Sequence, residues 1–167
     1  MLYLKALNEE DIKKEWSFLT NLPEDENGLI NPHSGVSFED FVKYDLPLLY
    51  NCSKGIELKE GYVPQTYYFL WEDKEIIGLF KFRHYLNDTL YKGSGHIGYT
   101  IKHNKREQGY GTKGLGLMLE IAKTIIPEEE VFMSANKNNI ASLKVMLNNG
   151  AYIHHEDENH FYTRIKK

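Results

Sequence analysis

The chain has a single cysteine, Cys52, among its 167 residues. One cysteine cannot build an internal disulfide framework or a cysteine-based zinc site, and it fits the reducing cytosol. No run of eighteen apolar residues is present, which excludes a transmembrane helix. The acidic stretch Glu9–Asp11 interrupts the N-terminus before an apolar leader could form. We therefore expect a soluble, unprocessed, cytoplasmic protein.

The sequence also lacks an excess of basic residues. Its net charge is −4, which argues against a long nucleic-acid footprint. Hydrophobic residues make up 41 % and charged residues 26 %, a composition typical of globular proteins, and the length predicts one domain over residues 1–167. Residues 1–60 hold 12 acids and 6 bases, whereas residues 61–167 hold 12 acids and 14 bases. We expect the two parts to face different ligands.

A cluster of bases lies within twelve residues of the second part. Lys102, Lys105, Arg106 and Lys113 are opposed there only by Glu107. Such a cluster predicts a site for a compact anion such as a phosphate.

Turn signals and apolar spacing predict an alternation of helices and strands. The order is two helices, three strands, a helix, a strand, a helix and two closing strands. The expected segments are a helix capped by Asn8, a loop over 22–35, a helix capped by Ser37 and interrupted before Pro47, strands over 66–71, 76–82 and 96–101, a helix ending before Pro127, a strand over 131–135, a helix capped by Asn139, and a hairpin over 151–165. This order indicates a mixed α/β fold whose sheet carries helices on both faces.

A glycine-rich turn opens the third of these helices. Gly109, Tyr110 and Gly111 follow a strand, where free backbone N–H groups and the positive helix end attract anions. Glycine lets a pyrophosphate approach the backbone, and Thr112 and Arg106 can add a hydroxyl and a charge. An ordinary strand-to-helix turn is the alternative.

Residues 109–114 also satisfy GxGxxG, the dinucleotide-binding fingerprint. A dinucleotide fold needs several further parallel βα units. Only 53 residues follow Gly114, and the last of them predict an antiparallel hairpin instead. A Walker A loop is excluded because no Gly-Lys-Ser/Thr follows.

Two separated motifs carry a resemblance to a known family. The segment Ile101–Thr112 resembles the RxxGxG/A acetyl-coenzyme A loop of the GNAT N-acetyltransferases, and Asn139–Ser142 with Gly150 resembles the downstream NxxS helix. The likeness covers residues 66–165. It implies a central, mostly antiparallel mixed sheet with one splayed parallel strand pair. In that fold residues 61–167 form the acetyl-CoA-binding core and residues 1–60 a helical part that covers the acceptor.

The resemblance implies transfer of the acetyl group of acetyl-CoA directly to a primary amine in a ternary complex. Pantetheine would pair with the backbone of Tyr99 and Ile101, and a strand amide near Tyr99 would polarise the thioester carbonyl. Asn139 and Ser142 would lie beside the sulfur. The loop residues expected to hold the pyrophosphate are Arg106, Gln108, Gly109, Tyr110, Gly111 and Thr112.

The transfer also needs groups that move protons. His96 is the first candidate for the base because it begins the strand where family members often place a glutamate, and its intrinsic pKa suits neutral pH. His84 is the second. Each is alternatively a packed or surface histidine. Where many relatives carry a tyrosine that protonates the thiolate this chain has Met146, so Ser142, a water or solvent would have to serve.

Several alternatives remain at this point. A non-catalytic acyl-CoA-binding or regulatory module and a nicotinamide-dependent oxidoreductase are the rival functions. The acceptor amine is a small molecule or a peptide; we expect no metal, nucleic-acid or membrane partner, and a homodimer is compatible with the sequence. The acids at 24–26 and 39–40 could attract a cationic amine, or they could serve only to cap helices and keep the protein soluble. Aromatic residues at 67–69 and Trp71 are candidates for an acceptor groove, with half of them expected in the core.

Overall fold

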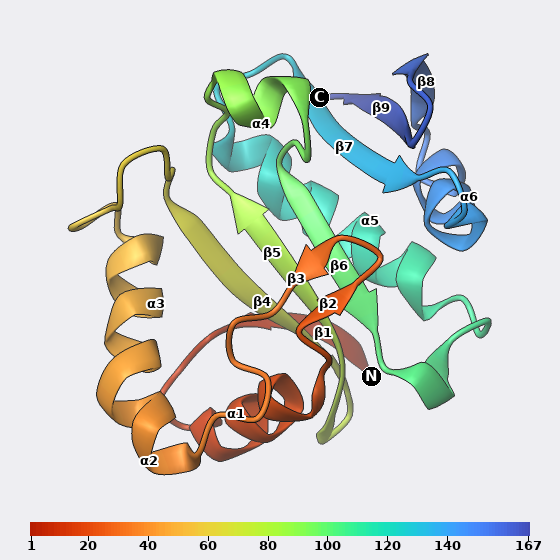
Figure 1. The fold of residues 1–167 in the computed structure, drawn as a ribbon. Coiled ribbons are helices and arrows are strands. Elements are labelled where there is room, and N and C mark those ends of the chain that lie inside the picture. Colours follow the sequence, from red (N-terminus) through yellow and green to blue (C-terminus); the bar gives the residue numbers. More distant parts are fainter.

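Two antiparallel sheets meet along β6 and β7 in the computed structural model, which describes all residues 1–167 (Figure 1). The first sheet has the order β1-β4-β5-β6 and the second the order β7-β9-β8. Their strands are β1 (Leu2–Ala6), β4 (Gln65–Glu72), β5 (Glu75–Arg83), β6 (Ile97–Ile101), β7 (Glu130–Asn136), β8 (Tyr152–Glu156) and β9 (His160–Lys166). The closing hairpin expected from the sequence is confirmed, with β9 inserted between β7 and β8.

The strands β6 and β7 correspond to the expected splayed pair. They share one isolated bridge of antiparallel type, between Gly95 and Met133, and form no ladder beyond it. Next to the bridge, the His96 N–H donates to the Phe132 carbonyl at 2.7 Å. Figure 1 shows the two strands diverging from this point. The divergence leaves backbone polar groups of β6 without a strand partner on that side.

Helices cover both faces of the first sheet. The helices are α1 (Ile12–Asn21), α2 (Phe38–Asp40), α3 (Leu46–Ser53), α4 (Asp88–Lys92), α5 (Tyr110–Ile125) and α6 (Ile140–Asn148), with a 3-10 turn over His103–Lys105. Figure 1 shows α5 behind the strands of this sheet. Phe80 and Leu115 are fully buried between sheet and α5, whereas Phe41 and Leu79 are fully buried on the face toward α1 to α3.

One glycine sets how closely α5 packs on the sheet. A Cβ at Gly114 would lie 2.8 Å from side-chain carbons of both Leu70 and Phe80. The last glycine of the GxGxxG pattern is therefore required by helix–sheet packing, because a larger residue would overpack the core.

The N-terminal third contains strands that the sequence did not predict. β1 pairs antiparallel with β4, placing Leu4 opposite Leu70, so the first residues extend the central sheet. Within the expected loop over 22–35, β2 (Asp25–Glu26) and β3 (Leu29–Ile30) form a hairpin. The part over residues 1–60 therefore contains the expected helices and, in addition, three short strands.

The predicted helix starts are partly confirmed. Ser37 accepts the Asp40 N–H at 3.2 Å and Asn139 accepts the Ser142 N–H at 3.3 Å, as expected for N-caps. The first helix begins later than expected, after Asp11, whose own N–H is bound by the Asn8 side chain at 3.0 Å. Helical structure continues through a π-turn over Phe41–Asp45, so Pro47 lies in the first turn of α3 and interrupts nothing.

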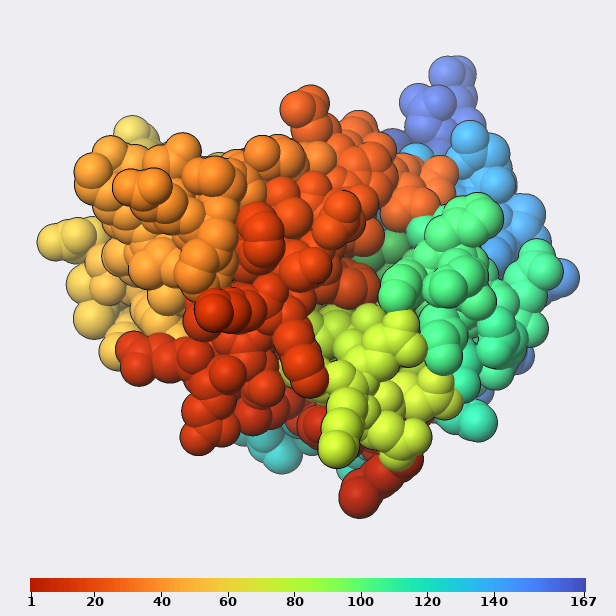
Figure 2. All heavy atoms as spheres, turned by 90° about the horizontal axis from the view of Figure 1, so that it is seen from below, coloured from red at the N-terminus to blue at the C-terminus, as the bar shows by residue number.

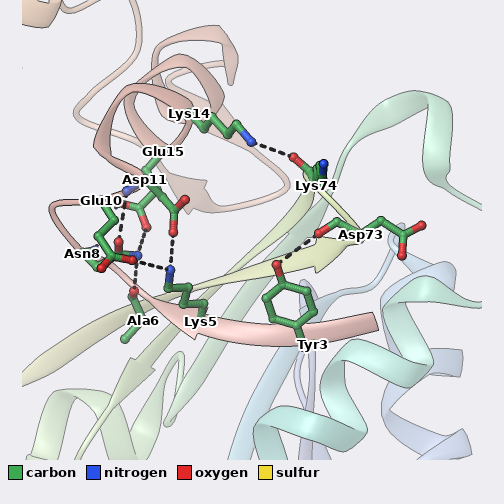
Figure 3. A network of polar contacts seen from close by, with 10 residues as sticks. All are labelled: Tyr3, Lys5, Ala6, Asn8, Glu10, Asp11, Lys14, Glu15, Asp73 and Lys74. Atoms are coloured by element: carbon green, nitrogen blue, oxygen red, sulfur yellow. Dashed lines mark hydrogen bonds and ion pairs between the residues drawn. The ribbon is translucent and has the colours of Figure 1, made fainter. Parts of the chain in front are cut away.

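A polar network joins β1 to α1 and to the β4–β5 turn (Figure 3). Lys5 Nζ donates to Asp11 at 2.5 Å, and the buried Glu15 accepts the Asn8 backbone and side-chain N–H groups at 3.2 and 2.9 Å. Lys14 donates to the Lys74 carbonyl at 3.0 Å. These contacts fix α1 against the sheet edge, and burial raises the pKa of Glu15 to about 8.

Candidate active site

A cavity of about 1120 Å³ occupies the opening between β6 and β7. Its size is that of a ligand-binding site. One end, here named the loop arm, is lined by Arg106, Glu107, Gly109, Gly111 and Thr112, by the N-cap Asn139 and by the first turns of α6. Gln108 and Tyr110 do not line it. The other end, here named the basic arm, is lined by Gln65, Tyr67, Lys81, Arg83 and Ser94. β6 runs between the two arms and lines both with Gly98–Ile101.

The β2–β3 hairpin forms a wall over this opening. Glu26 pairs with Arg106 and accepts the Thr100 hydroxyl at 3.1 Å, and the Leu29 side chain lies against Gly98. At the tip of the hairpin, Gly28 approaches the Asn136 side chain of β7. Figure 2 shows the orange atoms of this N-terminal region reaching green atoms near residues 100–110 and blue atoms of the C-terminal part. The hairpin thus spans both sides of the cavity.

The loop arm presents free backbone amides. The first intrahelical bond of α5 runs from Lys113 N–H to the Gly109 carbonyl at 3.1 Å. The amides of Tyr110, Gly111 and Thr112 precede it and have no partner within the helix. Gly109 has φ +80°, and open space lies at its Cβ position, so no side chain covers these amides at that point.

The bases around this loop are largely paired, contrary to the expectation that only Glu107 opposes them. Lys102 binds Glu75 at 2.6 Å, and Lys105 binds Glu72 at 2.7 Å. Both acids come from the β4–β5 turn, far away in sequence. With Arg106 held by Glu26, the backbone amides remain as free donors of the loop arm.

Tyr99 and Ser142 meet across the cavity. The Tyr99 hydroxyl lies 2.9 Å from Ser142 Oγ and donates toward the Ser142 carbonyl at 3.2 Å. Tyr99 stacks on Phe80, and burial raises the pKa of its hydroxyl to about 12. The sequence pointed to Tyr99 for its backbone, and the structure adds a hydroxyl from β6 beside α6.

Met146 packs in the core as the sequence suggested. It is fully buried, and the Thr163 hydroxyl lies 3.3 Å from its sulfur. Met146 therefore supplies no polar group to the cavity. The tyrosine hydroxyl that contacts Ser142 of the NxxS motif comes from Tyr99 instead.

His96 lies outside the cavity and is fully buried. Its Nδ1 accepts the Phe132 N–H at 2.9 Å, and its Nε2 lies 3.0 Å from a Glu128 carboxylate oxygen. These partners define a neutral imidazole protonated at Nε2, and burial lowers its pKa. With both ring nitrogens engaged by the protein, this geometry argues against the expectation that His96 is the base.

The other histidines are placed differently. His84 also lies outside the cavity; its Nε2 lies 2.8 Å from the Thr66 hydroxyl and its ring packs on Phe82. His160, at the start of β9, is the histidine that lines the cavity, and the sequence analysis did not select it. It lies beside Asp157 at 3.6 Å and is partly exposed at the rim.

The acidic and aromatic residues of the N-terminal half divide between surface, core and cavity. Glu24, Asp25, Glu39 and Asp40 are exposed and line no part of the cavity, whereas Glu26 does but is paired with Arg106. Of the aromatic run, Tyr67 lines the basic arm. Phe69 and Trp71 pack under α1, and Tyr68 packs on the opposite face.

The family model described as acetyltransferase (GNAT) domain matches residues 37–152. The chain therefore belongs to the GNAT acetyltransferase family, and it is an acyltransferase. The dinucleotide-binding alternative is excluded by the topology, because the ladders after α5 are antiparallel. No curated protein sequence matches the chain.

Solved structures share the fold at low identity. The Campylobacter jejuni N-acetyltransferase PseH in complex with acetyl coenzyme A is 21% identical, with 100% of this chain and 99% of that chain covered and a TM-score of 0.59. A ribosomal-protein-S5-alanine acetyltransferase from Vibrio fischeri is 14% identical, with 99% and 92% covered and a TM-score of 0.66. An aminoglycoside acetyltransferase, AAC(6')-Ib, in complex with ribostamycin and coenzyme A is 12% identical, with 99% and 93% covered and a TM-score of 0.66. No helix of this chain has the length and apolar character needed to cross a membrane.

Proposed function

We propose that this protein transfers an acetyl group from acetyl-CoA to a primary amine by direct attack in a ternary complex. The observation that carries the proposal is a continuous cavity that joins the glycine-rich loop, with the free amides of Gly111 and Thr112, to the opening between β6 and β7. One ligand can place its phosphates at the loop arm while an amine enters from the basic arm.

The residues of the loop arm would hold acetyl-CoA. The N–H groups of Tyr110, Gly111 and Thr112 would bind the pyrophosphate, and the unpaired edge of β6 near Tyr99 would pair with the pantetheine. Acetyl-CoA supplies the activated thioester. An N–H of β6 at this edge would stabilise the developing oxyanion.

The hydroxyls of Tyr99 and Ser142 would deliver the proton to the departing sulfur. Tyr99 would give its proton to the sulfur, and Ser142 Oγ, 2.9 Å away, would donate a hydrogen bond to the phenolate that is left. The proton released by the amine as the amide forms, passed through solvent, would restore the Tyr99 hydroxyl. A thiolate is a good leaving group near pH 8, so this acid need contribute only modestly.

The amine would enter as its neutral form. The cavity lining contains Glu26, which is paired with Arg106, Glu107 in the glycine-rich loop and His160 at the rim, and His96 and His84 lie outside the cavity. None of these groups belongs to the basic arm. The pH dependence of turnover would then follow the titration of the amine itself in solution.

Calorimetric titration with acetyl-CoA, and separately with NADH, tests the proposal together with an assay of thiol release in the presence of amines. Micromolar binding of acetyl-CoA alone and amine-dependent thiol release are expected. Binding of acetyl-CoA without thiol release from any amine would contradict the transferase proposal and favour a binding module.

A further inference from the structure

Two cationic side chains lie side by side on β5 in the basic arm. Lys81 and Arg83 alternate along the strand, so both extend from the face that carries α1 to α3 and the β2–β3 hairpin. Lys81 is only 6 % exposed, and both residues line the cavity. A lysine buried to this degree is ordinarily paired with an acid.

Neither cation has an acidic partner. Lys81 Nζ donates to the Ile30 carbonyl and lies 5.1 Å from the centre of the Tyr67 ring, while Arg83 donates to the Gly95 carbonyl at 3.0 Å. No carboxylate lies within 4.0 Å of either group, although the surface bases Lys5, Lys102 and Lys105 all have one. Burial lowers the pKa of both side chains, that of Lys81 to about 8.

The pair is separate from the groups that would hold the cofactor phosphates. Lys81 lies opposite Gly98 at the start of β6, and the glycine-rich loop follows Ile101 at its other end. The strand between them advances about 10 Å, at roughly 3.3 Å per residue. Further residues then lead to the amides of the loop arm.

We infer that the acceptor is a primary amine that also carries a carboxylate or phosphate group, and that Lys81 and Arg83 bind this anionic group. The inference rests on the proposed function, whose acceptor it specifies. An ammonium has three donors and a guanidinium five, so each retains N–H groups beyond the carbonyl it binds. An anion placed between them supplies the charge that the protein itself does not. Gln65 and Tyr67 add neutral polar groups beside it.

This inference reverses the expectation that the acidic N-terminal part attracts a cationic amine. The acids at 24, 25, 39 and 40 lie outside the cavity, and Glu26 is occupied by Arg106. The charge presented to the acceptor is therefore positive.

The test measures binding of matched amine pairs to the protein saturated with coenzyme A. Each pair differs only in the anionic group: an amino sugar phosphate against the amino sugar, and γ-aminobutyrate against its amide. Calorimetry on wild type, Lys81→Met and Lys81→Arg gives the affinities, and thiol release with acetyl-CoA gives turnover. Lys13→Met is the matched control, because Lys13 is exposed and lies outside the cavity.

We expect the charged member of at least one pair to bind about tenfold tighter than its neutral partner, and Lys81→Met to reduce that preference to about threefold or less. Lys81→Arg should retain the preference, and acetyl-CoA affinity should be the same in all variants. The amino sugar pair and the γ-aminobutyrate pair separate phosphate from carboxylate. Lys81→Met should also unfold at the wild-type temperature or above it, because it removes an unpaired buried charge.

The outcomes separate the inference from the proposed function. Tighter binding of charged amines without thiol release would support the anion site and contradict the transferase. Turnover of neutral amines with no preference for their charged partners would leave the transferase intact and overturn the anion site. Equal preference in wild type and Lys81→Met would overturn the assignment to Lys81.

Discussion

His96 Nδ1 accepts the Phe132 backbone N–H at 2.9 Å, and this bond lies at the point where the two sheets touch. The same imidazole contacts Glu128 through Nε2 at 3.0 Å. His96 therefore links β6, β7 and the loop before β7, and the opening between the strands begins directly beyond it.

Replacing His96 should affect stability more than chemistry. His96→Ala leaves the Phe132 N–H unpaired and a cavity in the core, so we expect a loss of about 3 kcal/mol in the free energy of unfolding. The pH profile of turnover should keep its shape. Urea unfolding and a pH–rate series check this, with the exposed His154→Ala as control. Loss of one limb of the pH profile in His96→Ala would instead restore His96 as the base.

Stability should also fall in acid because of His96. Burial lowers its pKa in the folded state, so the unfolded chain binds the proton more readily as pH falls through about 6.5. The difference in unfolding free energy between wild type and His96→Asn should shrink toward low pH, by at most about 1.4 kcal/mol per pH unit. Asparagine can still accept the Phe132 N–H, so the two proteins differ mainly in whether residue 96 can bind a proton. A constant difference over this range would contradict the assignment.

Gly109 and Gly35 form a matched pair of substitutions for the loop arm. Both have positive φ, +80° and +70°, with open space at the Cβ position, but only Gly109 lines the cavity. Alanine at either position should cost about 1 kcal/mol of stability. Only Gly109→Ala should weaken acetyl-CoA binding, by about tenfold or more, because its Cβ enters the space for the pyrophosphate. Calorimetry compares the two, and equal affinities would remove Gly109 from the anion site.

Tyr99→Phe should lower turnover by about tenfold and leave acetyl-CoA affinity unchanged, because it removes the hydroxyl that contacts Ser142. The matched control is Tyr68→Phe, since Tyr68 packs on the same face of the sheet but lies outside the cavity. Steady-state kinetics with one amine at saturating acetyl-CoA distinguishes the variants. Identical turnover in both would mean that solvent alone protonates the thiolate.

Glu15 gives stability the opposite pH dependence to His96. Its folded pKa is raised from 4.5 to about 8, so its contribution is fully present below about pH 4.5 and is lost as pH rises through about 8. Glu15→Gln should flatten the fall in unfolding free energy over this interval. Glu10→Gln, an exposed acid of the same network, should not (Figure 3). If the unfolding free energy of Glu15→Gln fell with pH as steeply as that of the wild type, Glu15 would not be the group responsible for the fall.

Much of the cofactor-binding half could be predicted because its signals are local. The cap Asn139 and the glycines at 109 and 111 act on the backbone within a few residues, so a short window of sequence contains the evidence. The antiparallel hairpins followed from alternating apolar residues in the same way. The glycine-rich turn was accordingly predicted in its position between β6 and α5, and the binding roles of its residues stay a prediction.

The basic arm could not be predicted, because its character depends on partners distant in sequence. Lys81 on a strand would normally be exposed, but here the Tyr67 ring and the Ile30 carbonyl of the β2–β3 hairpin lie against its ammonium group. The hairpin itself has two-residue strands, too short for any periodicity. The burial of His96 could not be predicted for the same reason, since it depends on Glu128, which lies 32 residues further along the chain.

The β2–β3 hairpin also determines at which stage of synthesis the cavity can form. The ion pair of Glu26 with Arg106 joins residues 80 positions apart, and Asn136 faces the tip of the same hairpin. On a ribosome the first third would emerge long before its partners, leaving the hairpin without Arg106 and without the surface that β7 provides. Contacts of such long range form slowly and late. The cavity is therefore completed only after most of the polypeptide has been synthesised, and a nascent fragment should have no competence to bind acetyl-CoA.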